Sequence, residues 1–384
     1  MTEKPLKIGL VAGEASGDLL GSSLMAAISE RKSNVEFVGV GGNTMLASGL
    51  TSLADMDHFA VNGFVDPLLR VGSLYRLLRL LVSELSTTDV VVGIDFNVFN
   101  LLLERRIRMR GVPTAHYVSP SVYAWRRGRV KRIEKAVDVI MTLFPFETAV
   151  YEERDIRAVF VGHPTADRFN PNEDKSSLMS KTRAANGWSS DSLILCLMPG
   201  SRGSEIGFHF ELFLETARVL QEQVQHPRFE VIVAARHPQV HQKWQTMCSN
   251  FPSLSVEISS LSATDVLAAS DIALVKSGTS TLEAMLMKTP MVVAYRMGAL
   301  TVKIVQSMMY IDHIALPNIL ANKTLVPEYI QDEATPQNLA NALFEQLNRD
   351  DITLLEEFAS LHRSLKQNAA SRAAETVLSL VESS

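Results

Sequence analysis

The chain has 384 residues, 46% of them hydrophobic and 21% charged, which excludes a disordered protein and suits two packed domains. Its 37 basic and 42 acidic side chains leave a net charge of −5, which argues against a nucleic-acid-binding protein. The two cysteines, Cys196 and Cys248, are too few for a disulfide framework or a structural zinc site, and no apolar run reaches the roughly 20 residues of a membrane-spanning helix.

Short β-rich runs alternate with stretches compatible with helices along most of the chain. The first series predicts the strands Lys7–Ala12, Glu36–Val40, Val90–Ile94, Thr114–Val118, Val137–Thr142 and Val159–Val161. A polar stretch at 170–190 predicts a linker, and the second series predicts the strands Leu193–Met198, Glu230–Ala234, Ser255–Ile258, Ile272–Val275 and Met291–Tyr295. Such alternation favours parallel sheets covered on both faces. We therefore expect an α/β protein with two Rossmann-like domains, 1–172 and 173–340, and a helical segment, 341–384, that can pack back on the first domain.

Carboxylates follow two predicted strands of the first domain, where open α/β sheets bind ligands. The run Gly13–Asp18 is a strand–glycine–helix junction that lacks the pattern of dinucleotide or P-loop sites. Glu14 and Asp18 suit a substrate loop, while helix capping by Ser16 and Asp18 is an equal alternative. Asp95 ends the third strand, where a carboxylate can act as a general base, and a turn or capping role is its alternative.

Further along the first domain, Ser119 and Ser121 flank Pro120 in a turn bordered by aromatic residues, which suits a sugar or acyl site. Two basic runs, 105–110 and 126–132, are typical of solvated helix faces, and contact with a phosphorylated substrate or an anionic membrane is the alternative. The stretch 64–81 is dense in Leu with Arg as its only cation. It predicts either an interfacial membrane helix or a buried helix with outward-reaching arginines.

The second domain holds two phosphate-type junctions after apolar strands. Pro199-Gly200-Ser201-Arg202 combines glycine, exposed amides and an arginine that can bind phosphate oxygens. Ser277-Gly278-Thr279 places hydroxyls at a helix start, with Glu283 available for ribose hydroxyls, and a capping box of Ser280 with Glu283 is the alternative. Together the junctions predict a nucleotide-diphosphate site, and no metal-ligand spacing or Ser-hydrolase elbow accompanies them.

Nine short motifs now resemble those of the lipid-A-disaccharide synthase family, in the family's order and across nearly the whole chain. They are Gly13–Asp18, Gly93–Asp95, Tyr117–Trp125, Pro145–Glu147, Gly162–Pro164, Pro199–Arg202, Ser277–Glu283, Tyr295–Met297 and Leu316–Asn318. The resemblance implies a GT-B-type glycosyltransferase whose two domains face a cleft. It also implies an inverting reaction of UDP-2,3-diacylglucosamine with 2,3-diacylglucosamine 1-phosphate that forms a β(1→6) disaccharide 1-phosphate and UDP.

The resemblance assigns roles to residues. Asp95 would be the base and Arg202 would neutralise the leaving UDP, with no metal or other cofactor. The implied substrate-binding residues are Glu14, Ser16, Gly17, Asp18, Asn100, Ser119, Ser121, Gly200, Ser201, Ser277, Gly278, Thr279, Glu283, Tyr295, Arg296 and Asn318. The first domain would bind the acceptor and dock on the anionic inner face of the bacterial inner membrane through Leu68, Leu69, Arg70, Leu74, Arg76, Leu77, Leu78, Arg79 and Leu81. The implied protein is cytoplasmic and peripheral, with a homodimer left open.

This sequence departs from the family pattern in one place that bears on chemistry. Val98 stands where the family often has a second Asp, and Asn97 replaces a Pro, so Asp95 acts alone or with Glu14 or Asp18. Two other functions stay open: another UDP-GlcNAc-using GT-B enzyme, either a transferase or an epimerase, and a non-catalytic sugar-nucleotide binder that docks on membranes.

Overall fold

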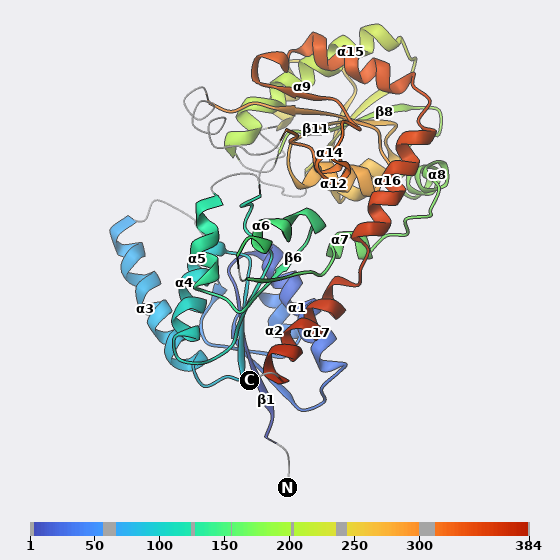
Figure 1. The fold of residues 1–384 in the computed structure, drawn as a ribbon. Coiled ribbons are helices and arrows are strands. Elements are labelled where there is room, and N and C mark those ends of the chain that lie inside the picture. The colour runs from blue at the N-terminus through green and yellow to red at the C-terminus, as the bar shows by residue number, and fades with distance from the viewer. Residues whose placement is uncertain are drawn as a thin grey trace. The chain divides into compact units, whose positions relative to one another are not determined.

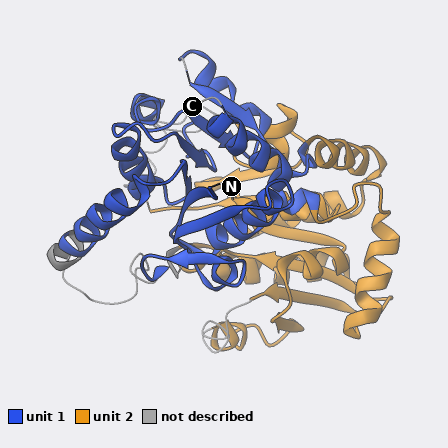
Figure 2. Ribbon diagram, turned by 90° about the horizontal axis from the view of Figure 1, so that it is seen from below, with its two compact units in different colours: residues 1–167, 365–384 blue, residues 168–364 orange. Residues whose placement is uncertain are grey.

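The computed structural model describes residues 4–56, 67–123, 127–154, 156–200, 203–235, 244–298 and 312–382. The chain divides into two compact units, residues 1–167 with 365–384 and residues 168–364 (Figure 2). Each unit is an α/β structure built on its own sheet, as predicted.

Unit 1 contains a seven-stranded parallel sheet in the order β3-β2-β1-β4-β5-β6-β7 (Figure 1). Its strands are β1 (Leu6–Ala12), β2 (Val35–Val40), β3 (Leu50–Ser52), β4 (Val90–Ile94), β5 (Thr114–Tyr117), β6 (Val139–Thr142) and β7 (Arg157–Phe160). Its helices are α1 (Ala15–Ser29), α2 (Asn43–Ala47), α3 (Pro67–Leu85), α4 (Asn97–Arg108), α5 (Val130–Glu134), α6 (Ala149–Glu152), α7 (Pro164–Asp167) and α17 (Ala369–Glu382). The six predicted strands are present, and the three-residue edge strand β3 was not predicted.

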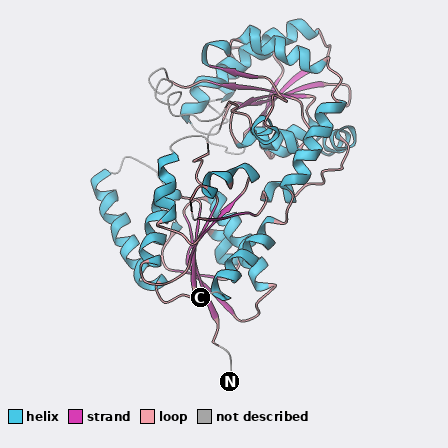
Figure 3. Cartoon of the chain, in the orientation of Figure 1, coloured by secondary structure: helices cyan, strands magenta, loops and turns pink. Residues whose placement is uncertain are grey.

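Both faces of this sheet are covered by helices (Figure 3). Successive strand residues point to opposite faces, so Leu10 packs in a cluster with residues of α1 and α17, whereas Val11 packs in a second cluster with residues of α3 and α4. A strand that is buried on both faces needs a continuous apolar run, which is why β1 and β4 were readable in the sequence.

Unit 2 repeats this plan with a six-stranded parallel sheet in the order β10-β9-β8-β11-β12-β13. Its strands are β8 (Leu193–Met198), β9 (Phe229–Ala234), β10 (Val256–Ser259), β11 (Ile272–Lys276), β12 (Met291–Tyr295) and β13 (Glu328–Ile330). Its helices are α8 (Lys175–Asn186), α9 (Gly203–Val224), α11 (Ala263–Ala269), α12 (Thr279–Leu286), α14 (Leu316–Ala321), α15 (Pro336–Leu347) and α16 (Ile352–Leu365). The short strand β13 was not predicted.

The expected polar linker is wrong for residues 175–186, which form helix α8. Asp174 caps the helix by accepting a hydrogen bond from the Ser177 amide, and Gly187 ends it in a left-handed conformation (φ 75°). Its attachment is polar rather than apolar: the buried Arg183 pairs with Asp271 at 2.7 Å and donates to the carbonyl oxygen of Ala269. An apolar-periodicity argument cannot detect a helix held in this way.

The C-terminal residues are all helical, and they are shared between the units. Helix α15 packs on α9 in unit 2, whereas α17 packs on α1 in unit 1 through Ala373, Ala374 and Val377. Asp167 accepts the Asn368 and Ala369 amides at the start of α17, which fixes the returning chain to unit 1. The helical segment 341–384 is therefore not a separate body.

Helix α3 carries the Leu/Arg stretch, and three of the nine membrane-docking assignments are wrong. Leu77, Leu78 and Leu81 are at most 7% exposed and belong to the core of unit 1, so these three cannot contact lipid. Arg76 and Arg79 are exposed and Leu74 is half-buried, while no side chain of 67–71, which includes Leu68, Leu69 and Arg70, is described. Among the described helices, none has both the length and the apolarity to cross a membrane.

Candidate active site

In each parallel sheet the strand order reverses on the two sides of the first strand. In unit 1 this switch point lies between β1 and β4, where Ala12 pairs with Ile94, and in unit 2 it lies between β8 and β11, where Met198 pairs with Val275. Ligands of open α/β sheets bind outside the carboxyl ends of the strands at such points. Five predicted residues follow these strands directly or after one position: Glu14, Asp95, Gly200, Ser277 and Gly278.

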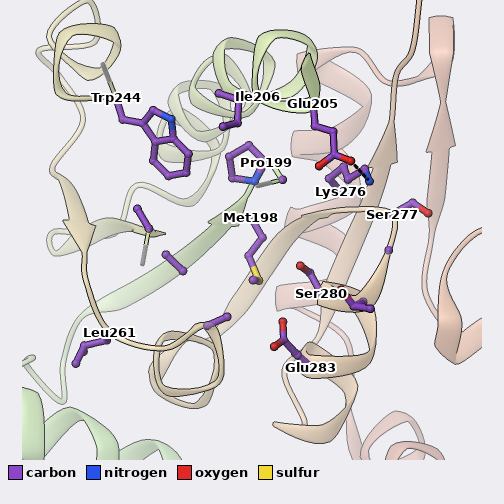
Figure 4. A pocket seen from close by; sticks show the side chains of 16 residues that line it. Met198, Pro199, Glu205, Ile206, Trp244, Leu261, Lys276, Ser277, Ser280 and Glu283 are labelled. Atoms are coloured by element: carbon purple, nitrogen blue, oxygen red, sulfur yellow. Dashed lines mark hydrogen bonds and ion pairs between the residues drawn. The ribbon is translucent and has the colours of Figure 1, made fainter. Parts of the chain in front are cut away.

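The switch point of unit 2 opens into a cavity of about 450 Å³ (Figure 4). Five of the predicted binding residues line it: Gly200, Ser277, Gly278, Thr279 and Glu283. The rest of its wall is Met198, Pro199, Glu205, Ile206, Ala234, Ala235, Trp244, Leu261, Ala263, Lys276 and Ser280. A cavity of this size with few polar groups matches small-ligand sites in general.

The backbone at both phosphate-type junctions needs glycine. Gly200 has a φ of 109°, and a Cβ there would lie 2.7 Å from a carboxylate oxygen of Glu205. Gly278 has a φ of 143° and is the N-cap of α12, with no side chain capping the helix. The capping box of Ser280 with Glu283 is thus wrong, because the helix already begins at Thr279. The first-turn amides of α12 lie at the cavity wall, as an anion site requires.

Three residues of this cavity were missed by the sequence analysis. Lys276 ends β11 and pairs with Glu205 of α9 at 3.1 Å, a contact drawn in Figure 4, and its ammonium lies 5.3 Å from the ring centroid of Tyr295. Trp244 is 2% exposed and stacks on Phe210 with centroids 4.8 Å apart. Lys276 brings a cation to the phosphate-type loops, and Trp244 brings a flat apolar wall, but neither lies in a motif that sequence spacing marks.

Five predicted residues of unit 2 are not part of the described cavity: Ser201, Arg202, Tyr295, Arg296 and Asn318. Ser201 and Arg202 lie outside the described residues. Tyr295 and Arg296 follow β12, and the Arg296 amide donates to Nε2 of His209, whose pKa is lowered by burial. Because Nε2 of His209 accepts from the Arg296 amide while Nδ1 donates to the Glu205 carbonyl, the imidazole is neutral and links the end of β12 to α9.

Asn318 serves the protein rather than a ligand, which corrects its assignment as a substrate-binding residue. Its amide nitrogen donates to the Val326 carbonyl and to Glu328, and its oxygen accepts from the amides of Leu325 and Val326. The side chain is fully buried, so no group remains for a substrate.

Asp95 occupies the switch point of unit 1 in a strained backbone. Asp95 and Phe96 have φ values of 49° and 46°, in the left-handed region that non-glycine residues rarely adopt. Neither side chain caps α4, so the capping alternative for Asp95 is wrong. One carboxylate oxygen accepts from Asn97 at 3.1 Å, and the side chain is half-buried. Strain of this kind clusters at functional sites, where it aims a side chain.

A chain of hydrogen bonds runs from Asp95 into the core of unit 1. The Asn97 amide nitrogen donates to Asp95, the Asn97 oxygen lies 3.0 Å from Nε2 of His116, and Nδ1 of His116 lies 2.7 Å from Glu104. His116 and Glu104 are both 0% exposed. Because the Asn97 oxygen can only accept, Nε2 of His116 is the donor in that hydrogen bond. Neither His116 nor Glu104 was predicted as a site residue.

Asn100, Ser119 and Asp18 use their polar groups for hydrogen bonds within unit 1, which corrects their assignment as substrate-binding residues. Asn100 donates to the carbonyl oxygens of Val11, Ile94 and Asp95 and so ties β1 to β4. Ser119 is buried and shares a 2.7 Å hydrogen bond with Tyr151.

Asp18 accepts from the amides of Gly42, Thr44 and Met45 and so caps α2, not its own helix as the alternative expected. Burial raises the pKa of Asp18, but these amides outweigh burial and hold the pKa below its usual value.

The remaining predicted residues of unit 1 lie near the carboxyl edge of the sheet. Glu14 and Ser16 are exposed at the start of α1, and Ser121 is exposed after β5. Gly17 is buried because it packs on Ala12, and a Cβ added to Gly17 would lie 3.2 Å from the Cβ of Ala12. Among these residues, Glu14 therefore adds an exposed carboxylate to that of Asp95 at this edge of the sheet.

The chain matches one family over nearly its whole length. The family model described as lipid-A-disaccharide synthetase matches residues 8–380. A lipid-A-disaccharide synthase from Pseudomonas aeruginosa (strain LESB58) is 44% identical over 383 residues, which cover 98% of each chain. A lipid-A-disaccharide synthase 2 from Legionella pneumophila (strain Lens) is 40% identical over 387 residues, which cover 100% of this chain and 99% of that one.

Solved structures support the fold at much lower identity. The glycotransferase of kitacinnamycin superposes with a TM-score of 0.61 at 15% identity and covers 98% of this chain and 100% of its own. At this identity the match speaks for the fold alone, and it agrees with the GT-B expectation of two parallel-sheet domains.

Proposed function

Because this chain belongs to the lipid-A-disaccharide synthetase family of glycosyltransferases, we propose that it joins UDP-2,3-diacylglucosamine to 2,3-diacylglucosamine 1-phosphate. The products are a β(1→6)-linked disaccharide 1-phosphate and UDP. The observation that carries the proposal is the pair of switch points, one with a nucleotide-sized cavity and one with the Asp95 carboxylate held by Asn97.

The donor binds through its UDP in the unit 2 cavity. The diphosphate lies against the first turn of α12 and the hydroxyls of Ser277 and Thr279, with Glu283 on the ribose. Lys276 adds a cation that the sequence analysis did not identify, and its ion pair with Glu205 holds its ammonium group beside Gly200. Trp244 supplies an apolar wall suited to a planar base.

The acceptor reacts at Asp95. Its carboxylate takes the proton of the 6-hydroxyl while that oxygen forms a bond to the anomeric carbon of the donor, and the bond to the diphosphate breaks with its electron pair leaving on UDP. A single displacement inverts the α-linked donor to the β product. Asn97 holds one oxygen of Asp95, so the other oxygen is available to the hydroxyl.

The charge on the departing UDP is met by the protein's own groups. We assign this role to Arg202, the α12 amides and Lys276, and the reaction as proposed needs no metal or other cofactor. Because both substrates are acylated, the protein works on the cytoplasmic side of the inner membrane, and the exposed side of α3 with Arg76 and Arg79 docks there.

The test is to incubate the purified chain with both acylated substrates and to measure UDP and disaccharide. Asp95→Asn and Arg202→Ala should each lower turnover at least about 100-fold, because one removes the base and the other removes charge stabilisation. Asp191→Asn, an exposed carboxylate of unit 2, is the matched control and should leave turnover unchanged. Near-wild-type turnover in Asp95→Asn would refute the base assignment, and UDP binding without any turnover would favour a non-catalytic binder.

A further inference from the structure

Unit 1 contains a second cavity, of about 460 Å³, between α4 and α5. We call it the α4–α5 groove. Its apolar lining is Val98, Leu101, Leu102 and Pro120, and Asn97 stands at one end. Its basic lining is Arg105, Arg129, Lys131, Arg132 and Lys135. None of its described lining residues is acidic.

The apolar floor is unusually open to solvent. Val98 is 82% exposed and Leu102 is 43% exposed, although both lie on α4 within about two turns of Asp95. Aliphatic side chains gathered in a concave site and left uncovered mark a binding surface for apolar groups. An extended hydrocarbon chain is the apolar ligand that a narrow groove accommodates.

Four cations of the basic rim have no ionic partner among the described residues. Arg105, Lys131, Arg132 and Lys135 make no ion pair with any described residue, whereas Arg108 on the same helix is paired with Asp138 at 2.8 Å. Unpaired cations crowded around one groove repel each other, and a phosphate group relieves that repulsion through charge-assisted hydrogen bonds.

The groove adjoins the proposed base. Asn97 lines the groove and also donates to Asp95 at 3.1 Å, so one residue joins the groove to the Asp95 carboxylate. We propose that the α4–α5 groove is the acceptor site, with an acyl chain of the sugar phosphate on the apolar floor and its phosphate on the basic rim. This inference rests on the proposed function and adds the place where the acceptor is held.

The occupant is a single acylated sugar phosphate rather than a bilayer. A bilayer surface docks on a protruding or flat face, whereas these side chains line a hollow. The coupling of the groove to Asp95 through Asn97 also has a purpose only for a molecule that reacts.

Two groove variants test the site in the full-length protein. Leu102→Glu should raise the KM for 2,3-diacylglucosamine 1-phosphate at least about tenfold, because a carboxylate replaces apolar contact and repels the acyl chain. Arg105→Glu with Arg132→Glu should raise the same KM about tenfold, with a smaller effect at high salt. The Kd for UDP and sedimentation with phosphatidylglycerol vesicles should stay unchanged in both.

Controls match each variant in chemistry and exposure. Met109→Glu replaces an exposed apolar residue at the far end of α4, about 10 Å along the helix from Leu102 and outside the groove lining. Lys181→Glu reverses an exposed charge on α8 in unit 2. Neither should change the acceptor KM, and all variants should keep the wild-type Tm within a few degrees.

An unchanged acceptor KM in an active protein overturns the groove and leaves the proposed reaction intact. Loss of vesicle sedimentation with an unchanged KM overturns it in favour of a membrane contact. Wild-type protein that makes no disaccharide sinks the proposed reaction. In that case the Kd of the acylated acceptor, measured at equilibrium, tests the groove separately. A Kd that Leu102→Glu leaves unchanged refutes the groove as the acceptor site.

Discussion

The buried pair of His116 and Glu104 gives the sharpest test of how Asp95 is aimed. Both side chains are fully buried and 2.7 Å apart, and His116 fixes the amide of Asn97 that donates to Asp95. His116→Leu leaves the Glu104 carboxyl buried without its partner, which costs about 3 kcal/mol of unfolding free energy. For a unit of this size that loss lowers Tm by roughly 6–12 °C, which still leaves a folded protein.

The kinetic effect is separable from the stability effect. His116→Leu also frees Asn97 to turn, so we expect kcat to fall about 10- to 100-fold while the KM for UDP-sugar changes little. In the double variant Glu104→Leu with His116→Leu, an apolar pair replaces the polar one, so stability returns while kcat stays low. Glu104→Gln keeps a partner for Nδ1 of His116 and should keep most of kcat.

Thermal unfolding and steady-state kinetics on the four proteins check this reasoning. If the double variant recovers both Tm and kcat, the pair only fills the core, and the positioning role is wrong. If His116→Leu lowers Tm but leaves kcat unchanged, Asn97 does not need His116 to hold Asp95.

Three further outcomes follow from the contacts in each unit. Asn318→Ala should lower the free energy of unfolding of unit 2 by about 2–4 kcal/mol, measured by denaturant titration, because four buried hydrogen bonds are lost. Burial raises the pKa of Glu147 to about 8, although two backbone amides donate hydrogen bonds to its carboxyl group. The free energy of unfolding should therefore fall as pH rises from about 4.5 to 8, by at most about 1.4 kcal/mol per pH unit. Glu147→Gln should flatten this pH dependence, measured as Tm against pH. Arg76→Glu with Arg79→Glu should reduce recovery on phosphatidylglycerol vesicles without changing Tm, whereas Leu77→Glu should lower Tm because it buries a charge.

The two parallel sheets could be predicted because most of their strands are continuous apolar runs in the sequence. Strands such as Val90–Ile94 are buried on both faces and cannot tolerate a polar residue, so their pattern is unambiguous. The two strands that were not predicted, β3 and β13, are three residues long and lie at the edges of their sheets. A short edge strand is less buried, so it does not need a continuous apolar run. Helix α8 escaped because Arg183 anchors it through polar contacts.

Within the site, glycine junctions were predictable and pairings were not. Positive φ values require glycine at positions 200 and 278. Because this constraint acts on a single residue, the identity of that residue in the sequence is enough to indicate it. The ion pair of Lys276 with Glu205 joins positions 71 residues apart, and only folding brings them together. Short polar residues inside motifs misled the prediction most, since Asp18 and Asn318 satisfy backbone groups of their own unit.

The left-handed turn at Asp95 connects these observations into one physical argument. A non-glycine residue with positive φ costs about 1–3 kcal/mol, and two in a row persist only if neighbouring bonds hold them. Asn100 supplies those bonds by donating to the carbonyls of Ile94 and Asp95, while its own oxygen remains buried without a partner. Asn100→Asp keeps the shape but removes the donor, so the turn should relax and turnover should fall with Asp95 untouched. A wild-type rate in Asn100→Asp would mean that the strain at Asp95 plays no part in aiming the base.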